Sequence, residues 1–349
     1  MKLTFTHPTK EHVTINFGQF TQIVGQNQEL KYYIWQLLIW YFDGKKYKEE
    51  DLSLFQQAEP QICCSEETVK RNEYQIFSIS DVRDIIEQMS YKKGSVSYAY
   101  MASKLQTVEV MDELEQMNIH LEKIASKINH NLNLTIGETS YLTETVELQI
   151  EQLLTKYFVP RFNYSTYNIA FEFVHNETKL RFFLNMLEEI LQQHSRKVLL
   201  IFKNLDDYLT YSSFYSICQE LERMCQTYPQ FHTIVFPSNE GYLYLTPAHI
   251  EFVNIISEQI EHFYDFDFMY ECYGNTHPSN DRLDEHAFLS SLRKIASYLF
   301  CSEIQHISLS MTDFTTLKIV NALYQYRISV PIEIEKTNSM IISYLRDGY

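Results

Sequence analysis

Residues 20–32 read FTQIVGQNQELKY, and this stretch says more about the fold than any other part of the chain. The apolar run over 20–24 predicts a buried strand, and the residues after Gly25 predict the start of a helix. Gly25 and Lys31 have the spacing of the first glycine and the lysine of a phosphate-binding loop. The stretch therefore predicts a strand–loop–helix unit of the kind that cradles nucleotides.

Replacements in the same loop argue against nucleotide chemistry. Leu30 stands at the position of the second glycine, and Tyr32 replaces the Ser or Thr whose hydroxyl would hold magnesium. Glu29 places a negative charge where a phosphate would lie. We therefore expect a degenerate nucleotide site that binds no ATP and supports no enzymatic activity.

A second predicted strand, KVLLIF at 197–202, leads to the same expectation. A nucleotide hydrolase places an acidic residue after such a strand to order its metal, whereas this chain has Lys203 and Asn204 there, with Asp206 and Asp207 only later. We expect a P-loop NTPase-like parallel sheet without the chemistry. The alternative is that neither segment is related to an NTPase, because a lone Gly-x5-Lys match is weak.

Composition places the chain among ordinary globular proteins. It has 349 residues, of which 45% are apolar and 21% charged. It contains no apolar run long enough to span a membrane, and its N-terminus lacks a long apolar stretch, so we expect a cytoplasmic protein with no membrane partner. The net charge of −16 argues against adhesion of the whole surface to nucleic acid, although a local basic lining is compatible with it.

The order of predicted elements indicates a divided α/β domain. Strands alternate with helices over 1–94 and again over 158–240, which predicts a core with a parallel sheet. Residues 95–157 show helical periodicity and predict an all-helical insertion, in which Gly137 separates two long helices of a hairpin. Residues 241–349 are expected to form a C-terminal α/β extension.

This pattern resembles the CRISPR-associated Csn2 family, the type II-A adaptation proteins. The features that carry the resemblance are the degenerate loop, the segment after the first helix, the helical hairpin, and two core strands, at 25–32, 42–46, 95–157, 197–202 and 234–237. They cover roughly the first 240 residues by motif order. The remaining residues would make this chain a long form with a C-terminal extension.

The resemblance implies a function in antiviral defence. It implies a homotetrameric ring that binds double-stranded DNA ends without sequence preference, threads the duplex through a basic hole and uses calcium for structure. It also implies that the protein assists spacer acquisition together with the Cas1–Cas2 integrase and the RNA-guided nuclease Cas9. A ring of this kind has no catalytic residues of its own.

A ring around DNA needs cations that face the duplex, because phosphate contacts supply affinity that does not depend on sequence. The candidate DNA-binding residues are lysines in three clusters: Lys45, Lys46 and Lys48; Lys92 and Lys93; and Lys123 and Lys127. Lys123 and Lys127 are four residues apart and are expected to share one helix face. Each cluster by itself is also compatible with an ordinary solvated surface.

Calcium requires several oxygen ligands at short range. Glu138, Glu144 and Glu147 lie near the predicted hairpin turn, and Glu144 and Glu147 are expected to be neighbours on a helix. They are the candidate metal ligands. The alternative is that they are solvated helix carboxylates.

Two rival functions stay open from the sequence. Asp265 and Asp267, with Glu271 and His262 nearby, would place two carboxylates on one strand face, as a metal-dependent nuclease or hydrolase would require. The other rival is a protein-interaction scaffold that does not bind DNA.

Overall fold

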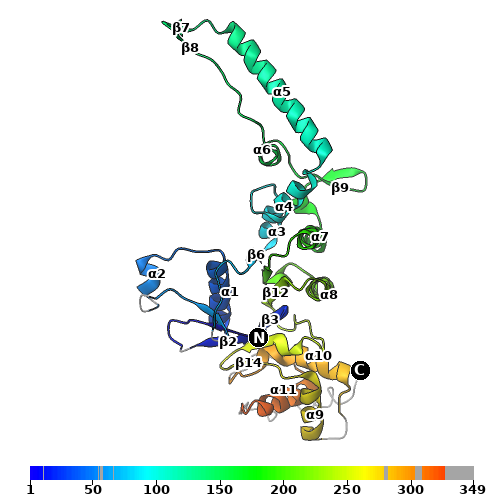
Figure 1. Cartoon of the computed structure of the whole chain (residues 1–349). Coiled ribbons are helices and arrows are strands. Elements are labelled where there is room, and N and C mark those ends of the chain that lie inside the picture. The colour runs from blue at the N-terminus through cyan, green and yellow to red at the C-terminus, as the bar shows by residue number, and fades with distance from the viewer. Residues whose placement is uncertain are drawn as a thin grey trace. The chain divides into compact units, whose positions relative to one another are not determined.

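The computed structural model describes residues 1–10, 12–53, 55, 58–65, 67–278, 282–302 and 309–326 (Figure 1). Contacts within the chain divide it into two compact units, formed by 1–73 with 234–349 and by 74–233. The parts of the predicted C-terminal extension at 279–281, 303–308 and 327–349 lie outside the described residues. The sequence predicts a different division, into segments at 1–94, 95–157, 158–240 and 241–349. Those boundaries stay predictions.

The first unit contains two sets of strands and five helices among its described residues. The strands that lie wholly within it are β1 (Lys2–Phe5), β2 (Val13–Asn16), β3 (Phe20–Val24), β4 (Ile62–Cys64), β5 (Glu67–Thr68), β13 (Val253–Ile256) and β14 (Ile260–His262). The helices are α1 (Gln28–Phe42), α2 (Glu49–Ser53), α9 (Phe266–Thr276), α10 (Glu285–Ile295) and α11 (Met311–Leu323).

Strand β3 of this unit is buried at all five positions, which its apolar residues predict and its polar residues Thr21 and Gln22 do not. It pairs in parallel with β13, in a register that places Val24 opposite Ile255, and β13 pairs antiparallel with β14. The other strands form a separate antiparallel sheet in the order β2-β1-β4-β5. The parallel pair brings the end of β13 against the loop that follows β3.

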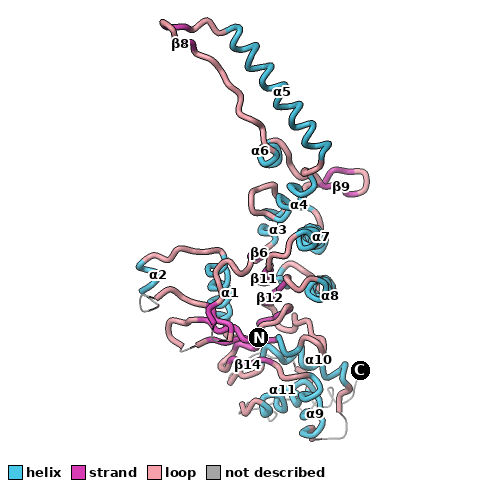
Figure 2. The backbone as a smooth tube through the Cα atoms, viewed as in Figure 1, coloured by secondary structure: helices cyan, strands magenta, loops and turns pink. Residues whose placement is uncertain are grey.

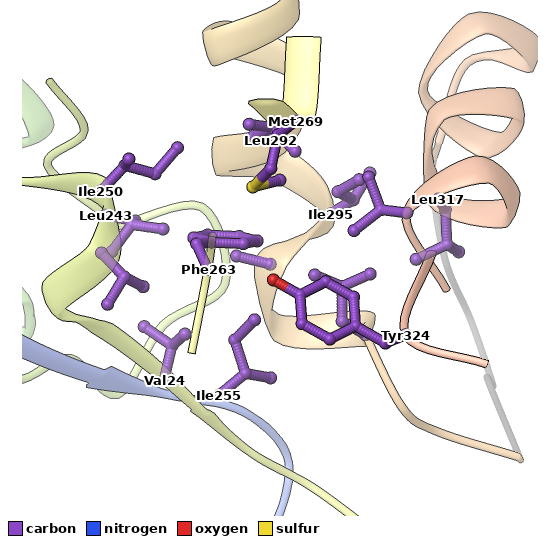
Figure 3. Close-up of a cluster of buried hydrophobic side chains, with 14 of the residues drawn as sticks. Val24, Leu243, Ile250, Ile255, Phe263, Met269, Leu292, Ile295, Leu317 and Tyr324 are labelled. Atoms are coloured by element: carbon purple, nitrogen blue, oxygen red, sulfur yellow. The ribbon is translucent and has the colours of Figure 1, made fainter. Parts of the chain in front are cut away.

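A hydrophobic cluster fixes these strand ends. Val24, Ile255 and Phe263 contribute to it from the strands and the segment after β14, and α9, α10 and α11 supply Met269, Leu292, Leu317 and their neighbours (Figure 3). The buried side chains of this cluster are at most 8% exposed. Burial of this much apolar surface is the main source of stability for the unit, and it anchors the residues on both sides of Gly25.

The second unit is built around another parallel strand pair. Its strands are β6 (Gln75–Ile79), β7 (Thr135–Ile136), β8 (Thr139–Ser140), β9 (Phe162–Tyr164), β10 (Tyr167–Ile169) and β11 (Val198–Lys203). Its helices are α3 (Val82–Gln88), α4 (Val96–Lys104), α5 (Val108–Asn131), α6 (Ile150–Lys156), α7 (Asn176–Gln193) and α8 (Tyr211–Thr227). The boundary between the units falls within β12 (Phe231–Phe236).

The central elements of this unit follow from their sequences. β6 pairs in parallel with β11, whose first five residues are all buried. Helix α3 begins after Asp81, whose side chain caps the helix by accepting hydrogen bonds from the N–H groups of Arg83 and Asp84. Helices α7 and α8 bury apolar side chains at three- and four-residue spacing. The structure thus confirms a mixed α/β fold with parallel strands.

The helical insertion differs from the prediction in its second half. Helix α5 is long, as expected, and Gly137 has a left-handed φ of +62° in the turn between β7 and β8. Residues 141–149 then run back along α5 without helical structure, and only the short α6 follows (Figure 2). The prediction of two long helices is therefore wrong. We call α5, β7, β8 and this return segment the arm.

Two asparagines explain why the return segment is extended. The side chain of Asn118 donates to the carbonyl of Leu148 at 3.2 Å and accepts from its N–H at 2.7 Å. The side chain of Asn129 makes the same pair of hydrogen bonds with Thr143, at 2.8 and 2.7 Å. Three helical turns separate the two asparagines, so both lie on one face of α5. Their amides satisfy backbone groups that a helix would have bonded internally.

Candidate functional site

The loop after β3 is closed against β13. Gly25 has a φ of +113°, and a Cβ atom built on it would lie 2.2 Å from the carbonyl oxygen of Ile256. Only glycine fits both this backbone conformation and this close approach. The glycine that resembles the first residue of a phosphate-binding loop is therefore required for packing.

The N–H groups of this loop are already hydrogen-bonded within the protein. The N–H of Asn27 donates to the Ile256 carbonyl at 3.0 Å, and the N–H of Gln26 donates to Ser257 Oγ at 3.3 Å. The N–H of Leu30 donates to the side chain of Asn27, which caps α1, at 3.0 Å. Groups of this kind bind phosphate in nucleotide-binding loops, whereas here they bind β13, the residue after it and the helix cap.

Lys31 is buried, with 6% of its surface exposed. Its ammonium group donates to the carbonyl of Pro237 at 3.0 Å and lies 3.5 Å from the carbonyl of Gly25. The two residues predicted for the degenerate nucleotide site are thus brought together. Their contacts hold backbone carbonyls in place.

The residues at the end of β11 occupy the position where a nucleotide hydrolase would have its acidic metal ligand. Burial lowers the pKa of the Lys203 ammonium group, which is partly covered at the strand tip. Asn204 adopts a left-handed conformation with a φ of +57°, and Asp206 is buried with 3% exposure. A cation and a tight turn thus stand where a hydrolase presents an acidic metal ligand.

The first lysine cluster lies between α1 and α2. Lys45 is half-buried: its ammonium group is 3.4 Å from the centre of the Trp40 ring and 3.6 Å from a carboxylate oxygen of Asp51. Lys46 and Lys48 are exposed, and neither forms an ion pair within the part of the chain that the structure describes. Of the three, Lys46 and Lys48 present accessible charges.

The second and third clusters belong to the other unit. Lys92 and Lys93 are exposed in the turn between α3 and α4, and Lys93 pairs with Glu151 at 3.4 Å across a solvated surface. Such an exposed pair contributes little to stability and leaves the ammonium group accessible. Lys123 and Lys127 lie on α5, one turn apart and exposed, as their spacing predicts.

The predicted metal ligands are spread along the arm. Glu138 is in the turn between β7 and β8, while Glu144 and Glu147 are exposed in the return segment. The prediction that Glu144 and Glu147 are helix neighbours is wrong because this segment is extended. Among the described residues, no group of three or more His, Cys, Asp and Glu side chains is arranged to hold a metal ion.

The carboxylates of the rival nuclease hypothesis do not share a strand face. Asp265 caps α9 by accepting a hydrogen bond from the N–H of Phe268 at 3.1 Å, and Asp267 and Glu271 lie within that helix. His262 belongs to β14, and burial lowers the pKa of its imidazole. The predicted strand geometry is wrong, because the aspartate that starts the segment is a helix cap.

Comparison with known proteins decides the family. A family model described as CRISPR-associated protein Csn2 subfamily St matches residues 5–342. The chain belongs to the Csn2 family. The crystal structure of Stu0660 of Streptococcus thermophilus is 39% identical in sequence and has a TM-score of 0.94, covering 99% of this chain and 100% of that chain. A comparison with curated proteins found no match.

Csn2 membership confirms the resemblance recognised from motif order. The match also includes the residues after position 240, which carried none of the recognised motifs. It places the chain among the CRISPR type II-A adaptation proteins. No described helix is both long and apolar enough to cross a membrane.

Sequence reasoning missed the residues that close the Gly25 loop. Ile256 and Ser257 contact this loop although they lie more than two hundred positions away in the chain. A parallel pairing over such a separation leaves no local pattern, because either strand would read the same with a different partner. The available signal was the stretch VNII at 253–256, whose three β-branched apolar residues favour a buried strand.

Proposed function

We propose that this Csn2 protein is a non-catalytic ring that binds double-stranded DNA ends without sequence preference during spacer acquisition. The observation that carries the proposal is the exposure of the predicted lysines on short loops and on one helix. All of them except Lys45 are exposed, in a chain whose net charge is −16. Accessible ammonium groups on an acidic protein favour a restricted contact with phosphates over adhesion of the whole surface.

The Gly25 loop supports a binding role without turnover. Its N–H groups and the ammonium group of Lys31 have partners within the chain. A nucleotide would have to displace these bonds and the close packing of Gly25 on Ile256. We infer a P-loop NTPase-like core whose nucleotide site has become structural, with no bound ATP.

A homotetramer would give this protein its affinity. Repeating a modest basic patch around a ring increases the effective concentration of phosphate contacts without new residues. The arm supports subunit contact because Met117, Leu121, Ile124 and Ile128 lie along α5 at helical spacing and are 36–53% exposed. Apolar surface of this kind is typical of an interaction site.

Calcium and protein partners complete the proposal. Calcium would use the exposed carboxylates of the arm, among them Glu138, Glu144 and Glu147, together with backbone carbonyls or a second subunit. The proposed protein partners are the Cas1–Cas2 integrase and the effector Cas9. Each partner would bind this protein while the protein holds an uncut DNA end.

Charge reversal tests the DNA interface. Lys46→Glu with Lys48→Glu should weaken binding to linear duplex DNA and lower the salt dependence of log K by about 0.9 for each phosphate that is no longer neutralised. The matched control is Lys10→Glu with Lys318→Glu, which reverses two exposed lysines outside the predicted clusters. Equal binding by both variants would reject this interface. If the DNA is shortened after incubation with divalent metal, the result would favour the rival function of a metal-dependent nuclease. If the unchanged protein binds no DNA, the remaining candidate is a protein-interaction scaffold.

A further inference from the structure

Residues 152–171 form a segment of this acidic protein whose charged side chains are all positive. The chain has 45 carboxylates, yet this segment contains no Asp or Glu. It contains Lys156 and Arg161, both exposed, among several aromatic residues. The segment runs from α6 through the β9–β10 hairpin, which projects as a separate loop from its unit (Figure 1).

The hairpin has one aromatic and apolar face. Its antiparallel register places Tyr164 opposite Tyr167 and Phe162 opposite Ile169. Because side chains alternate along a strand, these four residues share one face, while the paired asparagines at 163 and 168 share the other. The aromatic side of the hairpin is therefore set by its register.

Only the inner half of this face is packed. The ring of Phe162 stacks on Phe171 with centroids 4.3 Å apart and meets Phe182 edge-on at 5.6 Å. At the outer half, Tyr164 is 72% exposed and Tyr167 is 74% exposed. Neither tyrosine forms a ring contact within the described residues. The hairpin is thus anchored at one end and presents two rings at the other.

More exposed rings and the two cations lie beside the hairpin in the chain. Tyr157 is 67% exposed and Phe158 is 45% exposed, between Lys156 and Arg161. Exposed rings interleaved with cations are the pattern of surfaces on which nucleobases stack, since the rings meet the bases and the cations meet the phosphates. An apolar protein partner would use the rings alone, whereas the phosphates of a nucleic acid would also use the two exposed cations.

We propose that Tyr164 and Tyr167 stack on the nucleobase faces exposed at a DNA end, with Lys156 and Arg161 contacting the adjacent phosphates. The inference rests on the proposed function, because only an end exposes a base face: inside a duplex every base is covered by its neighbours. Two sources offer this chemistry. One is the terminal pair of a blunt duplex, and the other is an unpaired overhang.

Fluorescent DNA distinguishes the two sources. Linear duplexes carry 2-aminopurine in the terminal pair of a blunt end, in a short overhang, or at an internal position. Binding and emission are measured for the unchanged protein, for Tyr164→Ala with Tyr167→Ala, and for Tyr164→Phe with Tyr167→Phe. The phenylalanine substitutions keep the rings and remove the hydroxyl groups, and both sites are exposed, so neither pair of substitutions disturbs a packed core.

Stacking predicts a change of emission at the blunt end or at the overhang, and none at the internal position. The alanine substitutions should abolish this change and weaken binding about tenfold, while the phenylalanine substitutions should preserve both. A change in the blunt duplex would identify the terminal base pair as the stacking partner, and a change in the overhang would identify an unpaired base.

Contrary outcomes separate this inference from the proposed function. If the unchanged protein binds none of the duplexes, the proposed function fails. If it binds them and the alanine substitutions alter neither affinity nor emission, the stacking inference alone is wrong. A smaller particle mass in light scattering for the alanine substitutions, with that of the phenylalanine substitutions unchanged, would identify a subunit interface and overturn the inference as well.

Discussion

The Gly25 loop and the arm differ in how their conspicuous residues are used. In the loop, Gly25 packs on Ile256 and Lys31 is buried against backbone carbonyls. In the arm, Lys123 and Lys127 are exposed, and a Cβ atom at Gly137 would have nothing within 4 Å. The residues that look like a ligand site are structural, whereas the region without a recognisable motif presents accessible groups. Motif identity and accessibility therefore have to be judged separately.

The largest expected effect compares the two glycines. Gly25→Ala forces a side chain into the backbone of Ile256 at a positive φ, and we expect it to destabilise the first unit by about 3 kcal/mol or more. Gly137→Ala meets only backbone strain and should cost about 1 kcal/mol. Urea unfolding followed by circular dichroism measures both. Equal losses would contradict the close packing of the loop.

The next comparison uses the lysines. Lys31→Met leaves the Pro237 carbonyl without its ammonium partner and should cost about 2 kcal/mol of stability without changing DNA affinity. Lys123→Met should leave stability within about 0.5 kcal/mol and reduce DNA affinity and its salt dependence. Unfolding curves and DNA titrations on both variants provide the measurement. Two results would show that the loop binds a ligand after all. One is nucleotide binding by the unchanged protein that the stable Lys31→Met variant lacks, and the other is weaker DNA binding by that variant.

A smaller effect tests how the arm is held together. Asn118→Ala with Asn129→Ala removes the side-chain hydrogen bonds to Leu148 and Thr143. Amide hydrogen exchange at 141–149 should accelerate about thirtyfold, since each asparagine makes two of these hydrogen bonds and each bond is worth about 1 kcal/mol. Gln116→Ala, at an exposed position of the same helix, serves as the control and should leave exchange unchanged. Unaltered exchange in the double variant would show that other contacts hold the segment.

The smallest effect concerns acid. Hydrogen bonds from the hydroxyl and N–H of Ser302 and from the hydroxyl of Tyr326 hold the pKa of Glu258 below its usual value of 4.5. A lowered pKa contributes stability above the usual value, and this contribution is lost as the pH falls through the folded-state pKa. Glu258→Gln should therefore flatten the decline in stability of the first unit below about pH 4.5. An unchanged acid profile would mean that these hydrogen bonds form equally in the unfolded chain.

Local sequence patterns predicted the strands and helices whose signals are self-contained. The buried strand over 20–24, helix α1 after Asn27 and the strand at 197–202 all follow from the spacing of apolar residues. The return segment was missed because its apolar residues fit a helix, while the asparagines that hold it extended belong to another element. Its conformation is decided by side chains that its own sequence does not contain.

The candidate site was predictable in composition but only partly in geometry. Lys123 and Lys127 share a face because helical spacing fixes it. The burial of Lys31 depends on Pro237, and the placement of Lys45 depends on Trp40 and Asp51, so neither could be read from a cluster of charges. Asp265 shows the same limit, since a cap and a metal ligand are the same residue type in different surroundings.

We propose that the protein is a ring that loads onto DNA from its ends, and DNA without ends provides the test. Linear and covalently closed circular duplexes of one sequence are compared by mobility shift, with and without calcium, and the DNA is then checked for cleavage. We predict that linear DNA is bound in preference to circles and stays intact. Equal binding to both forms would contradict threading, and cleaved DNA would contradict a non-catalytic role.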